Sequence, residues 1–285
     1  MIANHLTPTV TALVLFAGVV HATWNAIASA IKDKLVAFGL IGATETVVAA
    51  LCLPLAGIPR SAALAFAAGS AVIHVGYTYG LLHSYRLGDF GRAYPLARGT
   101  APVLVAVGAW FLAAEHLAPV QLAGVCVVAA ALAAIVFAGG RLTRADVPAT
   151  LAALATGITI ASYTIVDGLG VRHAHDPLGY MSVLFLLQGP IIAIIAAASL
   201  RGRRRTERGP RDIPAGLTAG ALSLVAYGIV IWAQTQGALA LVSALRETSV
   251  ISGALIAALI FHEPLGRRRL APAVAVAAGI ILISL

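Results

Sequence analysis

The sequence has 285 residues, of which 60% are hydrophobic and only 11% are charged. This composition excludes an ordinary water-soluble domain, in which roughly a quarter of the residues are charged, and a mean hydropathy of +0.95 indicates a chain solvated mainly by lipid. The net charge of +8 could suggest a nucleic-acid partner, but the basic residues lie in short connections between apolar segments. In that position they indicate membrane topology instead.

Ten apolar segments follow one another along the chain, and a helix needs ~17–25 such residues to cross the hydrocarbon. They lie at 10–30, 36–57, 62–83, 93–113, 118–138, 148–168, 178–199, 214–235, 240–261 and 270–285. The first lacks a basic leader and is expected to be a full span, not a cleaved signal. The sequence therefore predicts an all-α integral membrane protein with ten transmembrane helices.

Basic residues are distributed unevenly among the nine predicted connections. Of the 19 Lys and Arg, fifteen lie in odd-numbered connections, and two, Arg60 and Arg172, lie in even-numbered ones. Because positive loops stay in the cytoplasm, we expect the odd connections to be cytoplasmic and both termini to face the exterior. The remaining two basic residues, Arg98 and Arg246, lie inside predicted spans.

The two halves of the chain match at a shift of 148 residues. The polar matches carry this signal, and they are Tyr79 with Tyr227, Arg98 with Arg246, Thr100 with Thr248, and Glu115 with Glu263. Five spans are an odd number, so a second copy must enter the membrane from the other side. We therefore predict two inverted five-helix repeats, residues 1–140 and 141–285, an architecture of secondary transporters whose substrate site lies at the repeat interface.

Charged residues within spans are the first candidates for function, because central placement costs ~2.5–3.5 kcal/mol. Arg98 and Arg246 each lie about one turn into a predicted helix. Two interpretations stay open: a guanidinium could bind a substrate carboxylate with its planar fork, or it could clamp two helices. Glu247, next to Arg246, could offer the complementary charge for a substrate ammonium.

Polar and aromatic side chains recur in the same spans. His21, Trp24 and Asn25 fall on one helix face, at i, i+3 and i+4, and a polar face is expected to point toward protein or water. Further candidates for substrate binding are His74, Tyr77, Tyr79, Tyr94, Tyr163 and Tyr227. Together these residues predict an apolar cavity with scattered hydrogen-bonding groups, the usual form of a small-molecule site.

Three acidic or titratable residues, Glu45, His74 and Asp167, are candidates for coupling transport to a proton gradient. Glu115 and Glu263 lie at predicted helix ends, where we favour a structural role such as capping the next helix. The sequence shows no metal-ligand spacing, phosphate-binding glycine loop or nucleophile motif. We therefore expect no cofactor, no metal, no catalytic group and no enzymatic activity.

These motifs resemble the drug/metabolite transporter superfamily in its EamA-type ten-helix branch. The resemblance rests on three stretches: His21-xx-Trp24-Asn25, Tyr94-Pro-Leu-Ala-Arg98-Gly-Thr-Ala-Pro102 with Glu115-His-Leu117, and Glu263-Pro-Leu265. It implies two inverted five-helix repeats around a central cavity and export of metabolites, often amino acids, from bacteria. By analogy with its aromatic amino acid exporters, we expect alternating-access export of aromatic or neutral amino acids.

The resemblance also sets expectations for location and partners. We expect a multi-pass protein of the bacterial inner membrane, with both termini in the periplasm as the basic connections indicate. We also expect it to work as a monomer, with a small-molecule substrate and no nucleic acid. Two alternatives stay open, a carrier of phosphorylated metabolites or cationic drugs and a non-transporting membrane sensor. The first span has no acid, which weakens a cation antiport of the small multidrug type, whereas the two arginines keep phosphorylated substrates open.

Overall fold

The computed structural model describes residues 6–87, 90–138, 143–201, 209–260 and 267–284. Within these ranges it describes all side chains except those of 81–87, 90–95, 135–138, 145, 254, 257–260 and 267–271. Tyr94, Glu263 and Leu265, which the sequence analysis singled out, thus have side chains outside the described part.

The described residues form eleven α-helices and one 3₁₀ turn, with no strand among them. The elements are α1 (Pro8–Ala30), α2 (Lys34–Ala56), α3 (Ser61–Leu87), α4 (Phe90–Leu112), α5 (Pro119–Ala138), η1 (Arg144–Asp146), α6 (Val147–His173), α7 (Pro177–Leu200), α8 (Asp212–Ala233), α9 (Leu239–Arg246), α10 (Ser249–Ile260) and α11 (Arg267–Ser284). The prediction of an all-helical protein is confirmed for this part of the chain.

Several helix starts follow from local capping chemistry. The side chains of Thr7, Asp33 and Asp176 accept hydrogen bonds from the first-turn amides of α1, α2 and α7. Pro8 and Pro177 occupy first positions, where a missing N–H costs nothing because that N–H has no helical partner. These signals begin the apolar runs as helices at defined residues.

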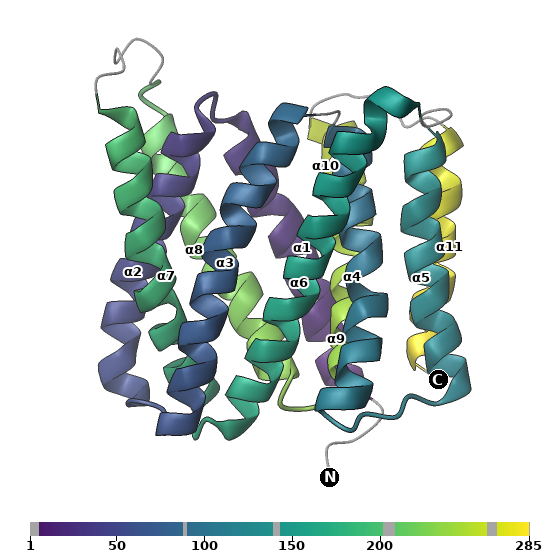
Figure 1. The fold of residues 1–285 in the computed structure, drawn as a ribbon, viewed down its shortest axis with the longest axis horizontal. Helices are drawn as coiled ribbons and strands as arrows, with labels where there is room; N and C mark the ends of the chain where they lie inside the picture. The colour runs from purple at the N-terminus through teal and green to yellow at the C-terminus, as the bar shows by residue number, and fades with distance from the viewer. Residues whose placement is uncertain (1–5, 88–89, 139–142, 202–208, 261–266, 285) are drawn as a thin grey trace.

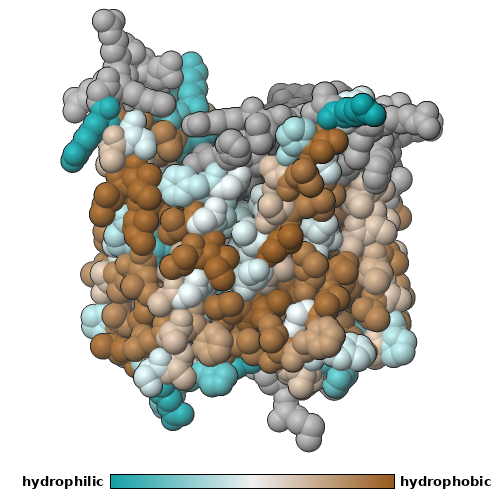
Figure 2. Space-filling model, in the orientation of Figure 1, coloured by the Kyte–Doolittle hydropathy of each residue, from teal (hydrophilic) through white to brown (hydrophobic). Residues whose placement is uncertain are grey.

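Six helical segments are long and apolar enough to cross a membrane, within α1, α2, α3, α6, α7 and α8. Shorter apolar stretches lie within α4, α5 and α11. Large hydrophobic side chains such as Leu55 and Phe111 are 84% and 79% exposed, and Figure 2 shows a broad apolar band between hydrophilic ends. The chain is therefore a multi-pass membrane protein.

The predicted ninth span, 240–261, is wrong as a single helix. Residues 239–260 form α9 and α10, separated by Glu247 and Thr248. The interruption uses tight turns, because the amides of Glu247 and Thr248 bond the carbonyls of Ala244 and Leu245, three residues back. Apolar composition predicted the extent of this segment but not its interruption.

Helices from the two halves of the chain pack against one another. α2 packs on α7, α5 on α11, α1 on α8 and α10, and α6 on α3 and α4. The start of α1 and the end of α11 lie at one end of the molecule, together with connections 57–60, 113–118, 174–176 and 234–238 (Figure 1). Connection 31–33 lies at the opposite end.

Two helix crossings between the halves are reciprocal glycine contacts. A Cβ added to Gly42 of α2 would lie 2.8 Å from the carbonyl oxygen of Gly189 of α7, and one added to Gly189 would lie 2.7 Å from that of Gly42. Gly124 of α5 and Gly279 of α11 show the same relation, at 2.8 and 2.9 Å. The backbones approach so closely that only glycine fits at these positions.

A side chain at Gly42 is expected to destabilise the protein. Gly42→Val overpacks the crossing with α7, at a typical cost of ~1–3 kcal/mol, so the thermal midpoint in detergent should fall. The matched control is Gly76→Val in α3, because Gly76 is exposed and has open space at its Cβ position. Equal midpoints for the two variants would contradict the packing account.

Candidate functional site

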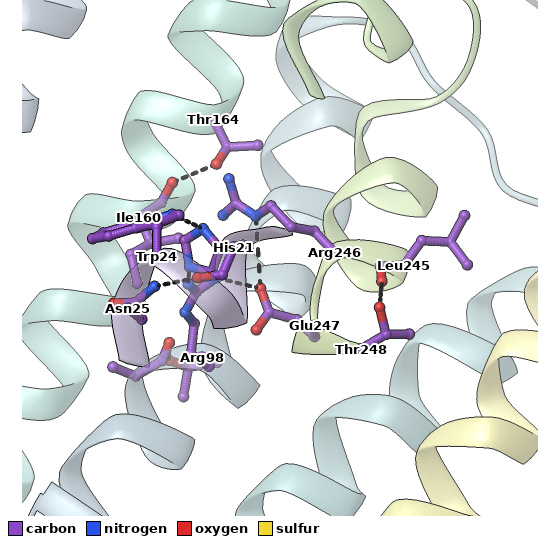
Figure 3. A network of polar contacts seen from close by, with 12 residues as sticks. His21, Trp24, Asn25, Arg98, Ile160, Thr164, Leu245, Arg246, Glu247 and Thr248 are labelled. Carbon is purple, nitrogen blue, oxygen red and sulfur yellow. Dashed lines mark hydrogen bonds and ion pairs between the residues drawn. The ribbon is translucent and has the colours of Figure 1, made fainter. Parts of the chain in front are cut away.

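The interruption between α9 and α10 places a cation and an anion at adjacent helix ends. Arg246 is the last residue of α9, and Glu247 precedes α10. Helix dipoles favour this order, since cations stabilise helix C-termini and anions stabilise N-termini. The Thr248 hydroxyl bonds the Leu245 carbonyl at 2.8 Å and so supplies one of the hydrogen bonds at the break (Figure 3).

The break is covered by α1. A Cβ at Gly18 would lie 2.6 Å from Thr248 Oγ1 and 3.3 Å from the Ser249 amide nitrogen. In the other half, Gly157 of α6 lies against Thr100 and the carbonyl of Ala97 in α4. Thr100 and Thr248 match at a shift of 148 residues. Each of them thus packs against a glycine of the first helix of the opposite half, Gly157 of α6 for Thr100 and Gly18 of α1 for Thr248.

Arg98 of α4 joins this break from the first half of the chain. Its Nη1 donates to Glu247 Oε1 at 3.1 Å, and the side chains of the pair are 3% and 0% exposed. Its Nη2 contacts His21 Nε2 in α1. Pro102 has no N–H with which to bond the Arg98 carbonyl, so α4 also lacks one backbone bond beside its arginine.

His21 faces two hydrogen-bond donors. Trp24 Nε1 donates to His21 Nδ1 at 3.2 Å, while Arg98 lies at Nε2. Indole and guanidinium groups only donate, whereas a neutral imidazole offers one acceptor nitrogen. Only one of the two hydrogen bonds can therefore form at a time, and the tautomer of His21 selects which.

Arg246 lies near the Glu247 carboxylate, but its hydrogen bonding differs from that of Arg98. Its Nε is 3.9 Å from Glu247 Oε1, beyond hydrogen-bond distance. The side chain is 4% exposed, and its Nε and Nη2 have no hydrogen-bond partner among the described residues. Its guanidinium carbon lies 5.9 Å from the ring centroid of Tyr163, within the range of a cation–π contact.

An aromatic cluster adjoins Arg246. Tyr163 of α6 stacks on His74 of α3 with ring centroids 4.0 Å apart. Tyr77 meets Tyr163 at 5.6 Å, and Tyr227 of α8 meets His74 at 5.5 Å and Phe185 of α7 at 5.8 Å. Residues from four helices thus form one aromatic wall beside the charged break.

Asp167 of α6 contacts this aromatic wall through Tyr227. Its carboxylate accepts hydrogen bonds from the hydroxyls of Tyr180, at 2.9 Å, and Tyr227, and it is fully buried. Both tyrosine donors are neutral, so the carboxylate has hydrogen bonds without an ion pair among the described residues. Sequence reasoning missed Tyr180, whose position at the start of α7 gave no sign of its partner.

The structure brings most of the predicted substrate-binding residues together. They meet through the contacts described above and are His21, Trp24, His74, Tyr77, Arg98, Tyr163, Tyr227, Arg246 and Glu247. Asn25 instead donates to the carbonyl of His21 in its own helix, at 2.9 Å, and Tyr79 is half-buried on α3. No group of three or more His, Cys, Asp or Glu in the described part could hold a metal ion.

Glu45, a predicted coupling residue, lies in a separate polar contact. The Ser223 hydroxyl of α8 donates to its Oε1 at 2.9 Å. Glu45 is 5% exposed in the middle of α2. This contact joins α2 and α8, neither of which carries one of the two buried arginines.

Glu115 takes a structural role, although not at the helix the sequence suggested. Its Oε2 accepts from the amide of Leu239, the first residue of α9, at 2.8 Å, whereas Gln121 bonds the Ala118 amide at the start of α5. Ala114, with φ of 51°, turns the chain at the end of α4. Glu115 thereby caps a helix of the opposite half.

Arg172 completes this contact, which we call the 115–172 latch. Arg172 Nη2 pairs with Glu115 Oε1 at 2.7 Å. Its Nε and Nη2 also donate to the carbonyls of Gln234 and Gly237, at 2.9 and 2.8 Å. The latch therefore joins the α4–α5 connection, the end of α6 and the α8–α9 connection. Sequence analysis had counted Arg172 only as a topology marker.

Comparisons with known proteins agree with a membrane transporter. Residues 147–285 match the model of the EamA-like transporter family. Twenty-nine chains of solved structures match, and one, described as "Crystal structure of protein", has a TM-score of 0.76 at 17% identity over 97% of this chain and 98% of that chain. This likeness establishes a shared fold alone. No curated protein matches the sequence.

Removing either partner of the buried ion pair is expected to lower the free energy of unfolding. Arg98→Gln leaves Glu247 with Arg246 alone as a counter-charge, at 3.9 Å, and Glu247→Gln leaves two buried arginines without their carboxylate. Each change should cost up to ~3–5 kcal/mol, with the larger loss in Glu247→Gln. The double variant should lose less than the sum, as read from unfolding in detergent. Arg60→Gln, an exposed charge, serves as control, and additive losses would contradict direct pairing.

Removing the Glu115 carboxylate is expected to loosen the start of α9. In Glu115→Ala the Leu239 amide loses its acceptor, so hydrogen exchange in a peptide covering 236–246 should speed up. His116→Ala, next in sequence and exposed, should leave exchange in this peptide unchanged. Identical exchange in both variants would show that Glu115 does not hold the start of α9.

Proposed function

We propose that this protein is a secondary transporter that exports amino acids with aromatic or neutral side chains, or similar small metabolites, across the bacterial inner membrane. The observation that carries the proposal is the interrupted ninth span, which buries Arg98, Arg246 and Glu247 beside an aromatic wall. Interrupted helices at the contact between two halves are typical of substrate sites in transporters. Such buried charges inside a membrane are costly and are retained at functional sites.

We further propose ten spans arranged as two inverted five-helix repeats, with α9 and α10 forming the ninth span together. The packing of α2 on α7 and α5 on α11, each through a reciprocal glycine contact, supports a two-fold relation between the halves. The matched contacts of Gly18 with Thr248 and Gly157 with Thr100 support it too. Alternating access would follow from one repeat rocking against the other.

The proposed orientation places both termini in the periplasm. Arg60 and Arg172 belong to connections at the end that holds the start of α1 and the end of α11, whereas Lys32 and Lys34 lie near the opposite end. Arg144 at the start of η1, Arg201 after the end of α7 and Arg211 before the start of α8 belong to the same opposite end, and basic connections favour the cytoplasm. We propose that the protein functions as a monomer.

Counterflow in proteoliposomes tests the transport proposal. Vesicles preloaded with one unlabelled amino acid should accumulate its labelled form when they contain the protein, and protein-free vesicles should not. Accumulation with Phe, Trp, Met or Thr would support amino acid transport, and repetition across a pH gradient would address coupling through Glu45, His74 or Asp167. Absence of counterflow for every amino acid, from folded protein, would contradict this function.

Tyr163 is expected to contribute stacking to transport of an aromatic substrate. Tyr163→Ala removes the ring between His74 and Arg246, and counterflow of Phe should fall roughly twofold to twelvefold if one ring contact of about 0.5–1.5 kcal/mol is lost. Tyr163→Phe keeps the ring and should retain most counterflow. Unchanged flux in Tyr163→Ala would remove this residue from the substrate path.

A further inference from the structure

The two buried arginines are not equivalent, although they match in the repeats. Arg98 already donates to Glu247 Oε1 and contacts His21. Arg246 has an ion-pair contact at 3.9 Å and no hydrogen bond from Nε or Nη2 among the described residues. Arg98 is therefore committed to the protein, whereas Arg246 has unused donors.

The unused donors of Arg246 form one edge of its guanidinium. The Nε and Nη2 N–H groups point in parallel from that edge, and this arrangement matches the two oxygens of a carboxylate. Leaving such buried donors unpaired costs about 1–3 kcal/mol or more for a charged group. A ligand carboxylate at this edge would remove that cost.

An unused acceptor lies next to these donors. Glu247 Oε2 is buried without a hydrogen-bond partner in the described part of the chain, while Oε1 of the same carboxylate faces both arginines. Figure 3 shows Arg246 and Glu247 side by side at the end of α9. One small group with adjacent positive and negative charges would satisfy Nε and Nη2 of Arg246 and Oε2 of Glu247 together.

We propose that the helix break is a head-group site for a zwitterionic α-amino acid. Its carboxylate binds the Nε and Nη2 edge of Arg246, and its ammonium binds Glu247 Oε2. Arg98 is a positioning residue that holds the Glu247 carboxylate through Oε1. This inference rests on the proposed transport function and adds to it the chemistry that selects the substrate.

The surroundings of the break fit such a ligand. Tyr163, whose ring lies beside the Arg246 guanidinium, begins the aromatic wall that also contains His74 and Tyr227. In the proposed complex, the apolar or aromatic side chain of the ligand lies against this wall. A phosphate monoester fits poorly, because its second negative charge and missing ammonium would face Glu247.

Ligand analogues test the site without relying on transport. All twenty amino acids are screened for binding to the detergent-solubilised wild-type protein by calorimetry, and the tightest is compared with its amide, its des-amino acid and its decarboxylated amine. Each analogue lacks one charge and should bind at least about tenfold more weakly, as expected for a lost charge-assisted hydrogen bond. An analogue that binds as tightly as the amino acid, or no binding by any amino acid, would overturn the proposal.

Two variants assign the two charges. Arg246→Gln should bind the amino acid and its amide equally, because the carboxylate no longer has an ionic partner. Glu247→Gln should bind the amino acid and the des-amino acid equally. If Glu247→Gln does not fold, Arg246→Gln alone decides, and a preserved preference for the free carboxylate in that variant would refute the site.

Binding and transport separate the two proposals. If the wild-type protein shows counterflow but binds the amino acid and its singly charged analogues equally, the transport function is kept and the head-group site is rejected. Charge-dependent binding without counterflow would keep the site and reject transport, and would favour a membrane sensor. Tighter binding of phenyl phosphate than of any amino acid would reject the zwitterion.

Discussion

The arrangement of the two halves depends on the ion pair between Arg98 and Glu247. A lone charge in the hydrocarbon is costly, so an arginine from the first half and a glutamate from the second must meet inside the protein. Their meeting requires the α9–α10 break to face α4 and α1. Irregular backbone at membrane depth is tolerated only where protein or water covers it, and the close approach of Gly18 provides part of that cover.

The two matching arginines lie in different surroundings. Arg98 and Arg246 occupy matching positions, but the residue that follows is Gly99 in one half and Glu247 in the other. The Glu247 carboxylate distinguishes the two arginines, because only Arg98 donates a hydrogen bond to it. Thus the two guanidiniums at matching positions of the sequence differ in the described part of the structure, because Arg98 hydrogen-bonds Glu247 whereas Nε and Nη2 of Arg246 have no hydrogen-bond partner.

Sequence could predict the helices and many of the residues that meet, because apolar runs, intramembrane charges and caps are local signals. It could not predict the break at Glu247 and Thr248, since no Pro or Gly lies between Leu239 and Ser252. Nor could it predict the partners of Glu115 and Asp167. Glu115 is 124 residues from Leu239, and Tyr227 is 60 residues from Asp167, and such pairs depend on how helices pack.

The 115–172 latch opposes opening of its end of the molecule. Arg172 cannot leave the carbonyls of Gln234 and Gly237 without also losing the carboxylate that caps α9. Separating the α4–α5 or the α8–α9 connection from Arg172 therefore breaks at least one hydrogen bond or the ion pair. This cost raises the free energy of opening at this end of the molecule.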